Sequence, residues 1–221
     1  MLYLTSFIKF SVNSVIILII GLNIYLSYKG FSNRAFFNKY KFSPHEIKRG
    51  EKIRYVSSGF LHVDSTHLFV NMFTLFFFTD AVIFRIGEIN FLIIYIISLI
   101  FGNWLTYRFN INKLNYSAVG ASGAVMGIVY SAILLNPEMT LFFFIIPMPG
   151  YLFGLGYLFY SIYSMKKLND NIGHEAHLGG AIAGFFSTIF IAPLVVITNL
   201  FTVFILFIPI VYFYIKSKSS W

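Results

Sequence analysis

Long apolar stretches, separated by shorter polar segments, dominate the pattern of this chain. A helix that crosses the hydrocarbon core of a membrane needs about 20 mostly apolar residues. Several stretches approach that length. The pattern predicts membrane-spanning helices near residues 11–28, 67–86, 91–108, 120–135, 141–164, 176–195 and 199–215. We therefore expect an all-α membrane protein that crosses the bilayer several times.

The last two predicted helices come from one long apolar stretch. Residues 178–215 carry no charge, and as one helix they would measure about 57 Å at 1.5 Å per residue. That is nearly twice the thickness of a hydrocarbon core, about 30 Å. Pro193 and the pair Thr198-Asn199 offer a break. The pattern thus favours a seventh helix, and a single long, bent sixth helix is the alternative.

Composition supports a membrane domain. Of 221 residues, 58% are hydrophobic and only 11% charged, with a mean hydropathy of +0.78, whereas about a quarter of a soluble domain is charged. The net charge is +8, but the basic residues lie in loops between apolar stretches. This placement suits anionic lipid head groups and argues against nucleic-acid binding. The chain has no cysteine, which excludes disulfides and thiol chemistry.

The connection 29–66 is too long for a simple turn and carries half of all Lys and Arg. Its aromatic residues alternate with basic ones, which indicates short amphipathic pieces lying in the membrane interface. The first apolar run lacks a small-residue cleavage site, so we expect an uncleaved first span and not a signal peptide. We divide the chain into residues 1–42, a core of 43–195, and 196–221.

Polar groups stand at the start of three apolar helices. Ser122 lies within Gly120-Ala121-Ser122-Gly123-Ala124, His177 begins the stretch 176–195, and His67 and Asn71 begin the stretch 67–86. Because alternate spans cross in the same direction, all four groups are expected at a similar depth on one side. Helix N-termini carry free N–H groups and partial positive charge, which favour a developing anion.

These groups suit nucleophilic catalysis. A serine becomes nucleophilic beside a base, and His177 is a suitable base for Ser122. Gly180 and Gly184 follow His177 by three and seven residues, so they allow close packing of its helix on the stretch 120–135. Packing of small residues is the non-catalytic alternative for the Ser122 motif.

His67 and Asn71 share a helix face at spacing i, i+4, and both can donate hydrogen bonds to an oxyanion. A polar pair that bridges two helices is the other interpretation. His62, five residues earlier, is expected to be structural.

Two other motifs fail. His174-Glu175-Ala176-His177 is one residue short of the HExxH zinc motif, so we expect no metal and no cofactor. Asp80 and Arg85 lie near the far end of their span, too distant by depth to complete a triad. The predicted constellation is a serine–histidine dyad.

Taken in order, three motifs resemble the rhomboid family of intramembrane serine proteases. They are His62-x4-His67-x3-Asn71, Gly120-Ala121-Ser122-Gly123 and His177-x2-Gly180-x3-Gly184. The resemblance implies a six-helix catalytic core, to which the stretch 199–215 adds a seventh helix.

Two further positions bear on this resemblance. Ile53-Arg54 is similar to the family's Trp-Arg pair in the first loop, with Ile in place of Trp, and makes Arg54 a structural residue near the site. Met126 stands where some members carry an aromatic residue near the catalytic histidine.

The resemblance implies an integral-membrane serine endopeptidase with Ser122 and His177 as the catalytic pair and His67 and Asn71 as oxyanion donors. Its partners would be transmembrane protein substrates and the lipid bilayer, with no nucleic acid. A non-catalytic member that binds client helices is the alternative, and a transporter is a third reading disfavoured by the lack of internal repeats.

The resemblance also implies a cytoplasmic N-terminus and a site that opens outside, and we expect a bacterial inner membrane. The basic loops favour the reverse orientation by the positive-inside rule. By resemblance, the fifth helix and the loop 165–175 would form a gate beside the second helix.

Overall fold

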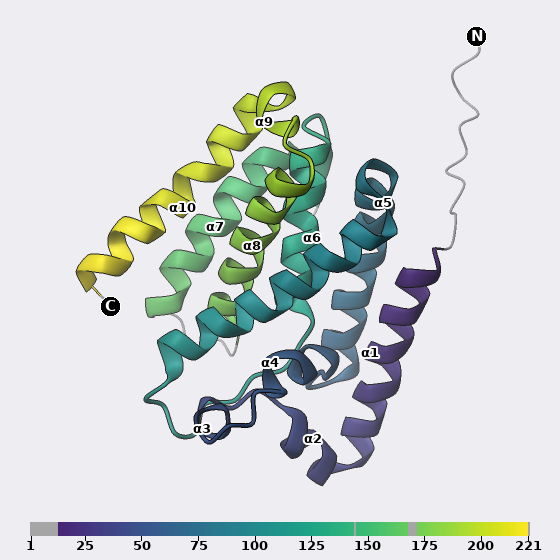
Figure 1. The fold of residues 1–221 in the computed structure, drawn as a ribbon, viewed down its shortest axis with the longest axis vertical. Helices are drawn as coiled ribbons and strands as arrows, with labels where there is room; N and C mark the ends of the chain where they lie inside the picture. Colours follow the sequence, from purple (N-terminus) through teal and green to yellow (C-terminus); the bar gives the residue numbers. More distant parts are fainter. Residues whose placement is uncertain (1–12, 144, 168–171, 221) are drawn as a thin grey trace.

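The computed structural model describes residues 13–143, 145–167 and 172–220. The fold is a bundle of apolar helices with one small hairpin. Figure 1 shows helix α1 (Ser14–Ser32) along one side of the bundle, α6 (Ser122–Leu135) and α8 (His174–Ile191) near its centre, and α7 (Gly150–Lys167) and α10 (Leu200–Ser220) on the other side. Residues 11 and 12 of the first predicted span lie outside the described residues.

Short helices form the connection after α1. They are α2 (Arg34–Tyr40), α3 (Pro44–Lys48), α4 (Arg54–Ser57) and the 3-10 helix η1 (Ser58–Phe60). Side chains cap the first two of these helices: Asn33 accepts a hydrogen bond from the Phe36 N–H, and Ser43 accepts one from the Glu46 N–H. Such caps satisfy backbone donors that a helix start leaves unpaired. In Figure 1 the short helices gather at one end of the bundle.

Helix α5 (Ser65–Asn110) contains both the second and the third predicted spans. It is bent at Gly87, where φ is 79° and ψ is 166°. Glycine has no Cβ and tolerates this conformation, which other residues rarely adopt. The two halves are therefore separate helical segments that meet at one residue, without the loop that the gap between 86 and 91 suggests.

The predicted helix over 141–164 is wrong in its first third. Strands β1 (Thr140–Phe143) and β2 (Ile146–Pro149) form an antiparallel hairpin, with Thr140 opposite Pro149. The helix α7 begins only at Gly150. Pro147 and Pro149 lack the N–H that a continuing helix needs, so the apolar composition of this segment was misleading.

The apolar stretch 178–215 forms two long helices, α8 and α10, and not one bent helix. Helix α8 ends at Ile191, before Pro193, and the short helix α9 (Val195–Thr198) precedes α10. At the break, the Asn199 side chain donates to the carbonyl oxygen of Leu134 at 2.8 Å. The break is therefore held against the end of α6.

Within the described part of the chain, α1, α5 and α10 are long and apolar enough to cross a membrane, and α6 is a shorter apolar helix. The chain is a multi-pass membrane protein. How many segments cross stays a prediction, as does the division into residues 1–42, 43–195 and 196–221.

Helices α6 and α8 make the closest packing in the core. A methyl group added to Gly180 would lie 2.6 Å from the carbonyl carbon of Gly123, and one added to Gly184 would lie 2.5 Å from the Cα of Gly127. Ordinary carbon contacts begin at 3.4 Å. Only glycine therefore fits at these points on α8, and the two backbones lie in direct contact.

Helix α10 packs along α7 (Figure 1). Leu206 covers Gly154, where an added methyl would lie 2.7 Å from the leucine side chain. Two ring pairs extend the contact: Tyr151 with Phe201 at 5.2 Å between centroids, and Phe159 with Tyr212 at 5.6 Å.

Candidate active site

Ser122 and His177 meet at the N-terminal ends of α6 and α8. The Nε2 atom of His177 lies 2.7 Å from the Oγ atom of Ser122, which is hydrogen-bonding distance. Both side chains are half-buried. In this geometry a neutral imidazole can accept the hydroxyl proton while the oxygen attacks an electrophile.

The close packing of α6 on α8 explains how residues 55 positions apart meet. Gly123 directly follows Ser122, and Gly180 follows His177 by three residues, less than one helical turn. Because these two glycines place the helix backbones in contact, they also set the separation of the two side chains. The spacing of the small residues in the sequence predicted this pairing.

A third side chain, Tyr157 of α7, also contacts the histidine. Its hydroxyl lies 2.7 Å from the Nδ1 atom of His177, on the far side of the ring from Ser122. This contact was not predicted, because the sequence motifs indicated a dyad and α7 was expected only as part of a gate. One related observation was available in the sequence: Met126 stands where some family members carry an aromatic residue near the histidine.

His67 lies against Gly120, in the loop that leads to Ser122. A methyl group added to Gly120 would lie 2.9 Å from the Nε2 atom of His67 and 3.7 Å from the Oγ atom of Ser122. Gly120 also has a φ of +133°, which side chains with a Cβ rarely adopt. The imidazole of His67 and the hydroxyl of Ser122 therefore border the space that a side chain at Gly120 would fill.

Asn71 is buried one turn after His67. Its side-chain amide donates one hydrogen bond, 3.0 Å long, to the carbonyl oxygen of His67. An amide has two N–H groups, so one donor is left for a ligand. The roles of His67 and Asn71 as oxyanion donors remain a prediction.

Backbone N–H groups near Ser122 divide into two sets. The N–H of Gly120 donates to the carbonyl oxygen of Ser58 at 3.0 Å, and the N–H of Ala121 donates to the Nε2 atom of His62 at 3.4 Å. The first hydrogen bond of α6 runs from Val125 to Ala121. Within the described residues, the N–H groups from Ser122 to Ala124 make no hydrogen bond, as is usual for the first turn of a helix. They can receive an anion.

His62 connects α1 to the residue before Ser122. Burial lowers the pKa of His62 to about 3, so its ring is neutral at physiological pH. Its Nε2 accepts from Ala121, so the proton stands on Nδ1, which donates to Ser27 of α1 at 2.9 Å. The Ser27 hydroxyl in turn donates to the carbonyl oxygen of Phe60.

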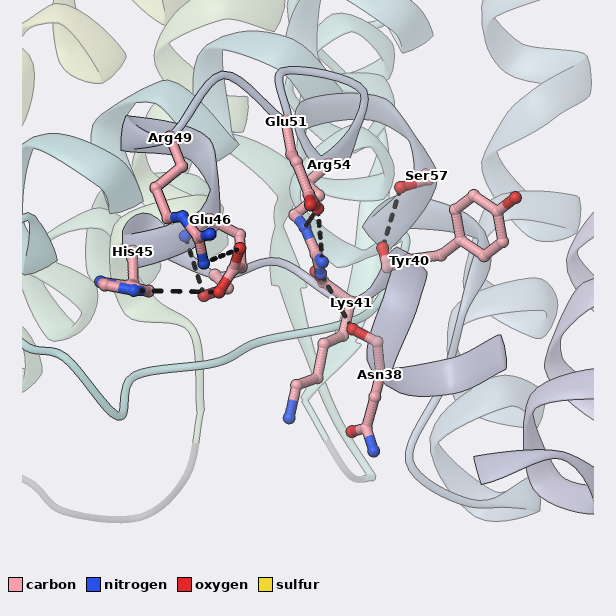
Figure 2. Close-up of polar contacts among 10 residues, drawn as sticks. Asn38, Tyr40, Lys41, His45, Glu46, Arg49, Glu51, Arg54 and Ser57 are labelled. Carbon is pink, nitrogen blue, oxygen red and sulfur yellow. Dashed lines mark hydrogen bonds and ion pairs between the residues drawn. The ribbon is translucent and has the colours of Figure 1, made fainter. Parts of the chain in front are cut away.

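Arg54 joins parts of the connection after α1 (Figure 2). Its buried guanidinium donates to the Glu51 carboxylate at 2.7 Å and to the carbonyl oxygens of Asn38 at 3.0 Å and Lys41 at 2.7 Å. The carbonyl of Arg54 accepts a hydrogen bond from the Ser58 hydroxyl. The carbonyl oxygen of Ser58 also accepts a hydrogen bond from the Gly120 N–H. Arg54 therefore supports the Ser122 loop indirectly, through Ser58.

Phe42 pairs with Ala118 in an isolated antiparallel bridge, with backbone hydrogen bonds of 2.9 and 3.2 Å. Together with the bonds at Gly120 and Ala121, this bridge fixes the loop that leads into α6. Within the described residues, no group of three His, Asp or Glu side chains is placed to hold a metal ion.

The fold and the site define a class: a polytopic helical membrane protein with a serine and a histidine hydrogen-bonded at two helix N-termini. Residues 49–194 match the family model of the Rhomboid domain. The chain belongs to the rhomboid family.

Curated relatives are similar over part of their length. RHOMBOID-like protein 12, mitochondrial, of Arabidopsis thaliana is 28% identical over 75% of this chain and 54% of its own length. The human Presenilin-associated rhomboid-like protein, mitochondrial, is 29% identical over 58% of this chain and 35% of its own length. The chain thus spans about half or less of these two relatives.

A bacterial protein of Bacillus subtilis, named "Putative rhomboid protease YdcA", is 31% identical over 63% of this chain and 67% of its own length. The relatives therefore include mitochondrial and bacterial proteins. They do not favour the bacterial inner membrane over other membranes.

Proposed function

We propose that this chain is an intramembrane serine endopeptidase that cleaves transmembrane protein substrates. The hydrogen bond between the Ser122 hydroxyl and His177 Nε2, 2.7 Å long, carries the proposal. The site lies at helix N-termini within a multi-pass membrane protein of the rhomboid family, which supports a substrate that is itself in the membrane.

In the proposed reaction, Ser122 Oγ attacks the carbonyl carbon of the scissile peptide bond while its proton passes to His177 Nε2. The tetrahedral intermediate carries an oxyanion. His67, Asn71 and the N–H groups at the start of α6 are the candidate donors to that oxyanion, and such donors are typically worth a few kcal/mol each in the transition state.

The intermediate then collapses. The C–N bond breaks, His177 gives its proton to the leaving amine, and an acyl-enzyme forms on Ser122. Water attacks the ester with the same histidine as base, which releases the second product and restores the hydroxyl. This sequence needs no cofactor.

A substrate helix must unwind before this reaction, because its backbone carbonyls are already hydrogen-bonded and shielded. We therefore propose a preference for small residues at the cleaved bond, with Gly or Pro nearby in the substrate. Seven crossings, with the site opening away from the cytoplasm, form part of the same proposal.

Labelling with a fluorophosphonate tests the proposal, since this reagent phosphonylates an activated serine. The purified protein in detergent should be labelled, and Ser122→Ala should not. Ser131→Ala is the matched control: Ser131 is a buried serine of the same helix, nine residues further on, and its loss should leave labelling intact.

Cleavage of a model transmembrane substrate completes the test. Ser122→Ala and His177→Ala should each abolish it, and the double variant should be little worse than either, because the two residues act as a unit. A folded Ser122→Ala protein that still takes the label or cleaves would refute Ser122 as the nucleophile, and a folded wild-type protein that does neither would favour a non-catalytic, helix-binding role.

A further inference from the structure

We propose that Tyr157 is a positioning residue for His177 and that it makes proton transfer at Ser122 depend on the placement of α7. The inference deepens the proposed protease function and rests on it. Its origin is the pair of 2.7 Å contacts on opposite nitrogens of one imidazole ring.

The role of base that we propose for His177 requires one particular tautomer of its ring. A neutral histidine carries one proton on one nitrogen. To act as base, His177 needs an unprotonated Nε2 facing Ser122, so its proton must stand on Nδ1. The Tyr157 hydroxyl is the group that Nδ1–H meets, and a phenolic oxygen accepts hydrogen bonds. A phenol can also donate to an unprotonated Nδ1; in the proposed site Tyr157 accepts, and this hydrogen bond stabilises the tautomer that can act as base.

The same contact matters once the proton has moved. His177 is then an imidazolium with N–H groups on both sides, and the one on Nδ1 still has the Tyr157 oxygen as acceptor. A serine protease triad uses a carboxylate for these two tasks. A neutral hydroxyl performs them with less electrostatic stabilisation, which suits a site beside lipid where a buried carboxylate would be costly.

The position of α7 determines whether the Tyr157 hydroxyl stays within hydrogen-bonding distance of His177. Its ring stacks on Phe153, one turn earlier, with centroids 5.8 Å apart and 18° between the planes. In Figure 1 α7 lies between α8 and α10. The Tyr130 hydroxyl of α6 donates to the carbonyl oxygen of Gly154. A displacement of α7 away from α8 would lengthen the contact from Tyr157 to His177 before it altered the contact from His177 to Ser122.

The test uses Tyr157→Phe, which keeps the ring and removes the hydroxyl. Tyr160→Phe is the matched control: it removes the next tyrosine hydroxyl of α7, whose ring faces His174 at 5.3 Å. Kinetics are measured with a transmembrane substrate and with a short soluble peptide under the same conditions.

We expect Tyr157→Phe to lower kcat about ten- to a hundredfold, the size expected for one hydrogen bond to a charged group, with KM unchanged. The factor should be the same for both substrates, because the defect lies in proton transfer. Tyr160→Phe should stay within about twofold. Unchanged kcat, or a loss confined to the transmembrane substrate, would overturn the inference; the latter would make Tyr157 part of a substrate gate only.

A readout independent of activity separates this inference from the proposed function. In a ¹⁵N-histidine-labelled protein, the His177 signals, identified by their loss in His177→Ala, should show a protonated Nδ1. Tyr157→Phe should convert them to a mixture of tautomers. If the wild-type protein shows this signature but no hydrolysis, the protease proposal fails and the positioning contact stands. If the tautomer is the same in both proteins, the positioning role is wrong.

Discussion

Replacing Gly180 by alanine is the sharpest test of how the bundle sets the geometry of the site. The added methyl would lie 2.6 Å from the carbonyl carbon of Gly123 and closer still to its oxygen. Backbone cannot move aside as a flexible side chain can. Because the core is close-packed, no empty space can take up the methyl group. Raising its 2.6 Å separation from the Gly123 carbonyl carbon to the 3.4 Å of ordinary contact requires α6 and α8 to separate locally by at least about 0.8 Å.

Separation of α6 from α8 would lengthen the hydrogen bond between Ser122 and His177. Ser122 precedes Gly123, and His177 lies less than a turn from Gly180, so most of the shift reaches the Oγ–Nε2 pair. A bond of 2.7 Å would lengthen to about 3.5 Å, where a hydrogen bond is no longer formed. Misplacement of reacting groups by about 1 Å can cost a hundredfold in rate. We expect kcat to fall by about that factor, with a loss of stability of about 1–3 kcal/mol from overpacking.

The assay compares three alanine variants of glycine for fluorophosphonate labelling and substrate cleavage, with circular dichroism as the check of folding. Gly156→Ala is the control, since an added methyl there meets nothing within 4 Å. Gly184→Ala separates the same helices one turn further from the site and should have an intermediate effect. A folded Gly180→Ala protein with the rate of Gly156→Ala would refute the argument that glycine contacts set the distance.

The remaining predictions concern the loop, the donors and the orientation. Gly120→Ala should abolish cleavage, because the residue has a φ of +133° and its methyl would press on His67; normal cleavage would contradict this. His67→Ala and Asn71→Ala should lower kcat about ten- to a thousandfold with KM nearly unchanged, and a change in KM alone would exclude the donor role. The pKa of His62 lies at about 3 in the folded chain, below the usual 6.5. Between pH 6.5 and 3, therefore, the imidazole of His62 is protonated in the unfolded chain but not in the folded one. Stability should therefore decline from pH 6.5 toward 3, and less steeply in His62→Asn, as measured by denaturation; equal slopes would show that other groups dominate. A tag after residue 221 should be accessible from outside intact cells if seven segments cross and the N-terminus is inside, and protection of both ends would indicate six.

The helices that carry the site were predictable because their signals are local. The polar residues at the start of α5, α6 and α8 stand out against apolar sequence, and the spacing of Gly180 and Gly184 indicates a face that allows close approach. Pro193 and Asn199 similarly marked the break before α10. Each of these features depends on residues close together in the chain.

What the sequence analysis missed depends on contacts between distant segments. The hairpin at 140–149 has an apolar composition similar to that of the helices, and only its prolines argued against a helix. Tyr157 is one of several aromatic residues on α7, and nothing in its own surroundings marks it. Its contact with His177 becomes visible only when α7 is placed beside α8.

The packing of α10 along α7 also bears on the order in which the site is assembled during synthesis. Residues 200–220 follow every residue of the candidate site, so a ribosome delivers Ser122, Tyr157 and His177 to the membrane before the helix that covers Gly154. Until α10 docks, α7 lacks the ring contacts with Phe201 and Tyr212. We expect a chain truncated after residue 198 to take the fluorophosphonate label slowly, and labelling at the full rate would show that α7 holds its place without α10. On this account the nascent chain carries Ser122, Tyr157 and His177 before α7 is braced, and it reacts slowly until α10 has docked.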